Sequence, residues 1–157
     1  MRRKDREITD HKKIEEIIRD CHCCRLGFND DDGAVYIVPL SFGYVCEDET
    51  DRLYFHSAKE GRKLDLIRKN SRVGFELDTN YQLNEAEIAC GYSARFQSVI
   101  GTGTVRILTE PEEKRRGLQA LMDHTAGPRA WEFSEEMLEA VCVFELTVES
   151  MACKEHL

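Results

Sequence analysis

Proline and glycine are scarce in this sequence, with 3 and 10 occurrences among 157 residues, and no segment is repetitive or of low complexity. Collagen-like and intrinsically disordered classes are therefore excluded, because both depart strongly from average composition. Hydrophobic residues make up 41% of the chain and charged residues 33%, as in ordinary globular proteins. A chain of this length fits one domain, so we expect a single folded unit over residues 1–157.

Positive charge is also in deficit, since 22 Lys and Arg face 30 Asp and Glu, giving a net charge of −8. This balance provides no general attraction to nucleic acid or to an anionic membrane, so we expect neither as a partner. The charged residues 1–7 are not followed by the apolar segment of a secretory signal, and no apolar run is long enough to span a membrane. Any anion that the protein binds must be held by a local site.

The seven cysteines are an odd number, in a chain long enough to fold without disulfides. This usage is typical of a reducing compartment and predicts a cytoplasmic protein. Cys21, His22, Cys23 and Cys24 are possible metal ligands, but zinc sites usually space paired cysteines by two to four residues, with a second pair further on. Since neighbouring residues of a strand point to opposite faces, we interpret this cluster as small buried thiols and predict no metal there.

Hydrophobic periodicity divides the chain into alternating short helices and strands. Ile14, Ile17, Ile18 and Cys21 follow a helical period behind Thr9-Asp10, which can cap a helix. Helices are predicted over residues 10–21, from 57 to about 70, over 110–126 and over 134–140, and strands over 23–28, 34–46, 53–55, 73–77, 92–108 and 141–151. Turns at 29–33 and 47–51 make the first three strands a meander, and residues 79–91 are predicted to be a polar loop.

This order of elements lacks the regular strand–helix–strand alternation of a parallel sheet. It predicts a mainly β fold, an antiparallel barrel with short helices attached. The fragment Gly101-Thr102-Gly103 lacks the third glycine and the strand-to-helix context of a dinucleotide-binding fingerprint. We therefore expect only a bend in the strand there.

The segment from His56 to Lys63 carries the most chemistry and lies where a strand leads into a helix. Ser57 and Glu60 have the spacing of a capping box, which would start the helix there and leave its free N–H groups pointing outward. Arg62 and Lys63 add two cations in the same turn, as a clamp for a monophosphate would require. A capped surface helix with two solvated basic residues explains the same pattern, so these features alone leave both readings open.

Two longer segments, Tyr36–Tyr44 and Leu53–Lys63, resemble the pyridoxamine 5'-phosphate oxidase-related flavoproteins, and among them the branch related to nitroimidazole-resistance proteins. The similarity continues through Ser98–Gly103 and the helix Glu112–His124, so it covers most of the chain in the same order. The resemblance implies an FMN-binding split β-barrel that works as a homodimer, with FMN in a groove at the subunit interface.

The resemblance also implies a set of cofactor-binding residues: Val38, Pro39, Leu40, Ser41, His56, Ser57, Ala58, Arg62, Lys63, Ser98 and Val99. The first four match the strand whose backbone follows the isoalloxazine edge. Pro39 has no backbone N–H to donate to the ring, whereas Leu40 and Ser41 each have one. The segment from His56 to Ala58 matches the part beside the ribityl chain and phosphate, and Arg62 and Lys63 match the phosphate-binding pair. Ser98 and Val99 match the stretch contributed by the neighbouring subunit.

The chain departs from true pyridoxamine phosphate oxidases, because it lacks their carboxy-terminal tryptophan and Arg-x-His signature, and its single Trp131 falls in a loop. We therefore predict an FMN-dependent oxidoreductase other than that oxidase. Electrons would pass from a reduced nicotinamide or another donor to a small electron-poor acceptor such as a nitroaromatic or a quinone. No catalytic residue is assigned, and His56 is expected to bind rather than to transfer protons. A flavin-binding or redox-sensing module without turnover is an alternative, as is a haem-binding relative with His56 or His124 as ligand.

Overall fold

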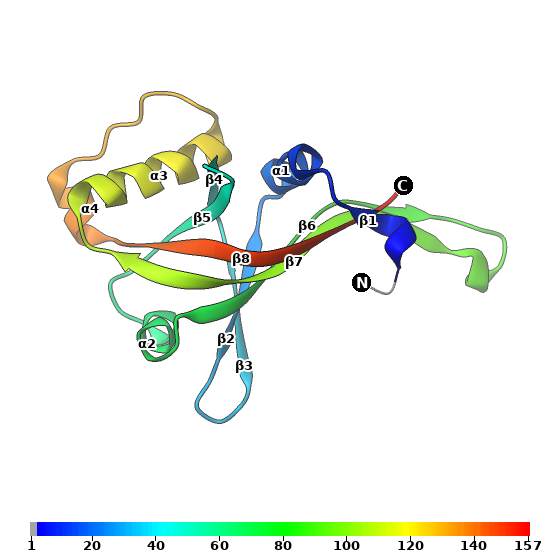
Figure 1. Cartoon of the computed structure of the whole chain (residues 1–157), viewed down its shortest axis with the longest axis horizontal. Helices are drawn as coiled ribbons and strands as arrows, with labels where there is room; N and C mark the ends of the chain where they lie inside the picture. The colour runs from blue at the N-terminus through cyan, green and yellow to red at the C-terminus, as the bar shows by residue number, and fades with distance from the viewer. Residues whose placement is uncertain (1–2) are drawn as a thin grey trace.

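The computed structural model describes residues 3–157, which form one eight-stranded sheet with short helices (Figure 1). The strands are β1 (Glu7–Ile8), β2 (Cys24–Asn29), β3 (Val35–Leu40), β4 (Gly43–Glu47), β5 (Thr50–Ser57), β6 (Arg72–Asn84), β7 (Ser93–Leu108) and β8 (Cys142–His156). The helices are η1 (Lys4–Arg6), α1 (His11–Asp20), α2 (Arg62–Lys69), η2 (Ala89–Gly91), α3 (Pro111–Ala126) and α4 (Glu135–Ala140). The strand order is β3-β2-β6-β7-β8-β5-β4, β1 pairs with β8, and all pairings are antiparallel. The predicted split β-barrel with short helices is confirmed.

The core lies inside the curved sheet and is closed at one side by α1. Alternate residues of β2 point inward, and Phe55 of β5 stacks on Phe144 of β8 with ring centroids 5.2 Å apart. Helix α1 adds three isoleucines to this core. Its predicted start is confirmed, because the Asp10 side chain caps the helix by accepting a hydrogen bond from the Lys12 amide at 3.1 Å.

Helices α3 and α4 cover the other face of β5 and β8, where a second apolar cluster forms (Figure 1). Tyr54 and Val143 point into this cluster, while the residues beside them in sequence point into the first one. Helix α3 lies directly on β4, since a Cβ atom added to Gly43 would overlap the backbone of Ala120 and Leu121. A glycine at this position therefore allows the helix to approach the strand.

The predicted strand over residues 34–46 is wrong, because the chain breaks it at Ser41 and Phe42. Phe42 is completely buried and packs against the ring of His124 at a centroid distance of 4.3 Å. Burial of this side chain turns the backbone, so β3 and β4 become the opposite edges of the sheet. The predicted three-strand meander is therefore replaced by two separate hairpins, β2–β3 and β4–β5.

The predicted polar loop over residues 79–91 is also wrong. Strand β6 continues to Asn84 and pairs with β7 past a register shift between Thr79 and Gln82, and the two strands form an arm that projects from the barrel (Figure 1). Both faces of the arm are largely exposed, so its residues do not alternate between polar and apolar and carry no strand signal. Strand β8 likewise runs to His156, beyond the predicted end at Met151.

The β7–β8 pairing shifts register between Thr102 and Gly103, where Glu149 of β8 is the extra residue. The bend predicted for the glycine pair itself stays a prediction. Within residues 3–157, no helix has the length and apolar character that crossing a bilayer would require.

Candidate functional site

The start of α2 differs from the predicted capping box. The helix begins at Arg62 with Gly61 as its N-cap, and the Ser57 hydroxyl instead donates to the carbonyl of Ala58 at 2.8 Å. Gly61 has φ +142°, a conformation that residues with a side chain rarely adopt. The capping box is therefore wrong, and no side chain occupies the helix start. The first backbone N–H groups of α2 remain available to an anion.

The two predicted phosphate-binding cations lie in the first turn of α2 and have different environments. The Arg62 guanidinium forms an ion pair with Asp30 in the β2–β3 turn and stacks over the Tyr36 ring at 4.7 Å. The backbone N–H of Asp31 and this guanidinium hold the pKa of Asp30 below its usual value. Lys63 is half-buried and takes part in none of the ion pairs of the described residues. Its ammonium is thus the cation at this turn that has no carboxylate partner.

Ser57 ends β5 next to this helix start and pairs with Cys142 of β8. Burial raises the pKa of the Cys142 thiol, and the positive charge of Lys63 is among the effects that oppose this rise. Lys63 lies in the first turn of α2, the helix that follows β5 in the chain. The structure brings together Ser57, Ala58, Arg62 and Lys63, as the sequence predicts.

The four predicted residues around β3 present different groups. Val38 and Leu40 pack against the core, whereas Pro39 and Ser41 are exposed. Because β3 is an edge strand and proline has no N–H, Pro39 occupies a position whose backbone faces away from β2. Leu40 follows it and points its amide toward β2. The better placed backbone N–H donors are those of Ile37, on the free edge, and of Ser41, beyond the end of the strand.

Two glycines interrupt the side chains on the outer face of the sheet next to β3. Ile37 of β3 pairs with Gly27 of β2, and Gly27 pairs with Gly74 of β6, so two glycines lie side by side. Ser98 on β7 is half-buried, but Val99 is fully buried and faces the core. Any contact of Val99 with a ligand must therefore use its backbone.

His56 does not lie with the other predicted residues. It is exposed on the face of β5 that looks toward α3 and α4, at the edge of a hollow of about 320 Å³. The other residues of this hollow are apolar: Leu118, Leu121, Met122, Phe133, Met137, Ala140 and Val141. His124, the other histidine weighed as a ligand, is engaged with the carbonyl of Cys21 at 2.7 Å. Burial lowers the pKa of His124, which favours the neutral ring.

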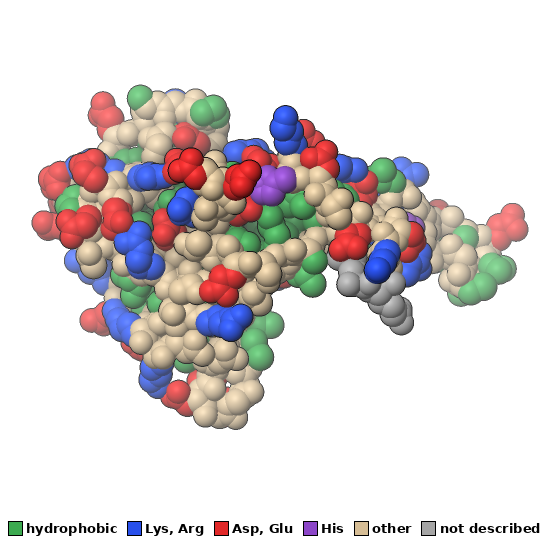
Figure 2. All heavy atoms as spheres, viewed as in Figure 1, with side chains coloured by type: hydrophobic (Ala, Val, Ile, Leu, Met, Phe, Trp, Pro, Cys, Tyr) green, Lys and Arg blue, Asp and Glu red, His purple; other side chains and the backbone are tan. Residues whose placement is uncertain are grey.

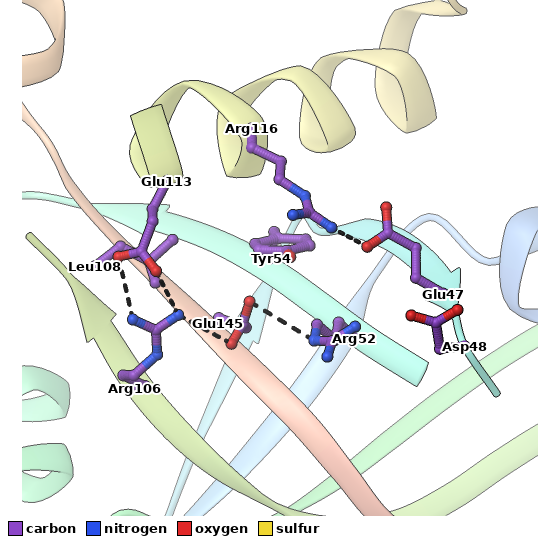
Figure 3. A pocket seen from close by; sticks show the side chains of 9 residues that line it. All are labelled: Glu47, Asp48, Arg52, Tyr54, Arg106, Leu108, Glu113, Arg116 and Glu145. Atoms are coloured by element: carbon purple, nitrogen blue, oxygen red, sulfur yellow. Dashed lines mark hydrogen bonds and ion pairs between the residues drawn. The ribbon is translucent and has the colours of Figure 1, made fainter. Parts of the chain in front are cut away.

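A second hollow, of about 250 Å³, is lined by charged residues of β4, β5, β7, β8 and α3 (Figure 3). Its three arginines all have carboxylate partners. Arg116 pairs with Glu47, and Arg106 lies 2.9 Å from Glu113. Arg52 lies 4.0 Å from Glu145. Because these charges already compensate one another, the hollow offers no free cation for a phosphate.

The cysteine cluster weighed as a metal site is spread between the core and the surface. Cys21 and Cys24 are buried, which raises the pKa of both thiols, that of Cys21 to about 12. Cys21 also donates to the carbonyl of Ile17 at 3.1 Å, while His22 is exposed and Cys23 half-buried. Such thiols are poor nucleophiles and poor ligands at neutral pH.

Sequence reasoning missed two residues of the site, Asp30 and Tyr36, which hold Arg62. From the sequence, Asp30 is predicted only as part of a turn, and Tyr36 is part of a strand and of a segment that carries the family resemblance, with no binding role assigned to either. Their contacts with α2 join segments about 30 residues apart, and no local pattern signals them.

A family model described as pyridoxamine 5'-phosphate oxidase matches residues 10–155. Comparison with curated protein sequences finds no match.

Solved structures share the fold. A protein provisionally named a 5-nitroimidazole antibiotic resistance protein, from Bacteroides thetaiotaomicron VPI-5482, is 32% identical with a TM-score of 0.81, over 95% of this chain and 86% of that one. A protein from Mycobacterium smegmatis, named for binding FAD and heme, is 17% identical with a TM-score of 0.83, and the match covers 96% of this chain and 73% of that one. A FAD-binding protein from Mesorhizobium loti is 21% identical with a TM-score of 0.66, and the match covers 97% of this chain and 98% of that one. The last two similarities concern the fold alone.

Proposed function

The chain belongs to the pyridoxamine 5'-phosphate oxidase family, and from this premise we propose that it is an FMN-binding oxidoreductase. The observation that carries the proposal is the start of α2, where unpaired N–H groups, Arg62 and Lys63 meet beside the edge strand β3. FMN differs from riboflavin by a phosphate, and this is the part of the molecule that such a turn recognises. Solved structures of this fold include proteins named for binding flavin.

The residues present fit a phosphate monoester. Gly61 leaves the helix start without a side chain, so an anion can approach the backbone closely. Lys63 supplies an ammonium without a carboxylate partner, and Arg62 is available once the phosphate competes with Asp30. Ser57 adds a hydroxyl beside the turn. Together these groups can satisfy several phosphate oxygens.

The glycine pair on the outer face next to β3 leaves room for a planar ring system. Gly27 and Gly74 contribute no side chains to this face, the Val35 side chain lies beside Gly27, and the free edge of β3 offers backbone N–H and C=O groups. Bound FMN would supply the redox chemistry, so the chain itself needs no nucleophile. The protein binds and orients the flavin and limits access of water. The acceptor is a small electron-poor molecule such as a nitroaromatic or a quinone, reached after reduction by a nicotinamide or another donor.

We expect the freshly purified protein to be yellow and to release noncovalent FMN on denaturation. An absorption spectrum, followed by mass analysis of the released flavin, checks this. A protein that remains colourless after addition of FMN would contradict the proposal. Release of FAD alone, or a haem spectrum, would contradict the assignment of FMN.

Anaerobic mixing with NADH or NADPH separates an enzyme from a flavin carrier or sensor. Bleaching of the flavin, and its return on addition of a nitroaromatic or a quinone, is expected of the oxidoreductase. Two results together would support the non-catalytic module instead. Neither nicotinamide would bleach the flavin, and protein reduced with dithionite would not reduce an acceptor.

We further propose that the protein is a homodimer that shares the flavin face. Val35 and Ile37 of β3 are 62% and 61% exposed, and Ile100 of β7 is 51% exposed. These side chains lie on the same outer face as the glycine pair, and exposed apolar patches of this kind mark interfaces. A second copy placed on this face would cover them, and its Ser98 segment could reach the flavin. We also propose a cytoplasmic location, with which seven free cysteines agree.

Sedimentation at micromolar concentration is expected to give a dimer. Ile100→Glu would place a charge in the interface, so it should shift the protein toward monomer and weaken FMN binding together. Met137→Glu, at an equally exposed position on α4, is the matched control and should leave the dimer intact. A wild-type monomer with full FMN affinity would contradict the shared site.

A further inference from the structure

A cluster of potential metal ligands lies where α1 meets the β4–β5 hairpin, away from the proposed flavin site. His11 and Glu15 lie one turn apart on α1, and Cys46 lies on β4. One donor atom of each lies within 4.8 Å of the other two, and residues 3–157 contain no other trio of His, Cys, Asp or Glu donors arranged in this way. Figure 2 shows acidic side chains beside a histidine over this junction.

The two ring nitrogens of His11 have different partners. Nδ1 lies 3.1 Å from Glu15 Oε1, and Nε2 lies 3.1 Å from Asp51 Oδ2. Asp51 is the one buried charged side chain among the described residues, at 7% exposure, and its other oxygen accepts a hydrogen bond from the Tyr44 hydroxyl. A fixed carboxylate thus holds one side of the ring. The same arrangement orients histidine ligands in metal sites.

We propose that His11 Nδ1, a Glu15 carboxylate oxygen and the Cys46 thiolate bind one divalent metal ion of the zinc class. Water occupies the fourth position, and Asp51 is the positioning residue that orients His11. A nitrogen, an oxygen and a sulfur donor suit zinc, whereas magnesium and calcium prefer oxygen ligands throughout. This site does not depend on the assignment of FMN.

The geometry requires only a small closure of the cluster. Metal–ligand bonds of about 2.0–2.3 Å place the donors of a tetrahedral site roughly 3.3–3.6 Å apart, so separations within 4.8 Å must shorten by at most about 1.5 Å. His11 has a side chain that is 45% exposed, and that of Glu15 is 27% exposed. Both can adjust, and an ion can enter from solvent.

The charges around the cluster also fit a divalent cation. Burial and the carboxylates of Asp51 and Glu15 raise the pKa of the Cys46 thiol, so the ion itself must displace the thiol proton, which passes to solvent. The Glu15 carboxylate and the resulting thiolate then neutralise the ion. Glu15 Oε2 faces Arg19 at 3.7 Å, leaving Oε1 for the cluster. The guanidinium also lies 5.0 Å above the Tyr44 ring. The bound ion would tie α1 to β4.

A titration of the chelator-treated full-length protein with Co²⁺ and then Zn²⁺ tests the site. One equivalent of Co²⁺ should produce a thiolate-to-cobalt charge-transfer band in the near ultraviolet, seen in difference spectra, and Zn²⁺ should remove it. Cys46→Ser should abolish the band and weaken Zn²⁺ binding at least tenfold. Asp51→Asn should keep the band at saturation but weaken binding tenfold to a hundredfold, as loss of an outer-sphere partner does.

Cys90→Ser and Glu16→Gln are matched controls, since both residues are exposed and lie outside the cluster. Neither should change the band or the affinity. If Cys46→Ser fails to fold by circular dichroism, His11→Gln takes its place, because its exposed side chain makes it the milder change. A wild-type protein without the band, or a band that survives loss of Cys46 and disappears in Cys23→Ser, would overturn the proposal. The cluster would then be only a histidine shared between two carboxylates.

Discussion

Replacement of Lys63 by alanine is expected to weaken FMN binding tenfold to a hundredfold while leaving riboflavin binding nearly unchanged. A charge-assisted hydrogen bond contributes about 1.5–3 kcal/mol, which corresponds to this range of affinity. Lys63 is half-buried and has no ion-pair partner among the described residues, so its ammonium is available to the phosphate. Fluorescence titration of flavin-free protein with each ligand gives the two dissociation constants.

Lys69→Ala is the matched control for this experiment. It removes one positive charge from the last turn of the same helix, where Lys69 pairs with Asp31. We expect its FMN affinity to stay close to that of the wild type. If Lys63→Ala lowers the affinities for FMN and riboflavin by the same factor, the residue supports the helix and does not bind phosphate.

Replacement of Gly43 by alanine is expected to destabilise the protein by about 3 kcal/mol or more. The added Cβ would overlap the backbone of Ala120 and Leu121, and a helix backbone cannot rotate away as a flexible side chain can. Helix α3 would have to move off β4, which would open the second apolar cluster. Urea unfolding of the flavin-free protein measures the loss in the free energy of unfolding without a contribution from flavin binding.

Gly74→Ala is the control, because it also changes a strand glycine but finds space for the new methyl group. The nearest atom to its Cβ would be the carbonyl oxygen of Gly101 at 3.8 Å, an ordinary contact. We expect a change of about 1 kcal/mol or less in either direction. Equal stability of Gly43→Ala and wild type would mean that α3 does not lie against β4 as described.

Local patterns predicted much of this fold. The apolar period of Ile14, Ile17 and Ile18 is set by one face of a helix, and the structure confirms α1. Strand–turn signals likewise located β2, β5 and the first part of β6. Such patterns succeed because burial on one face imposes a period on the sequence.

Sequence patterns failed where both faces of an element share the same environment, and where the burial of one side chain decides the path of the backbone. The β6–β7 arm is exposed on both faces, so nothing in residues 79–84 marks a strand. The break between β3 and β4 follows from burial of Phe42 against His124, a contact between segments about 80 residues apart. The helix start at Gly61 depends on a backbone conformation that the competing Ser57–Glu60 spacing obscured.

The sequence by itself determined the antiparallel class, the family and the concentration of basic residues at one helix start, because each depends on residues close together in the chain. Only the tertiary structure decided that Arg62 faces Asp30 and Tyr36 while His56 lies on the other side of β5. It also decided that His11, Glu15, Cys46 and Asp51 converge. Packing of α1 on the hairpin creates that proximity, and a linear pattern carries no information on which distant side chains packing will bring together.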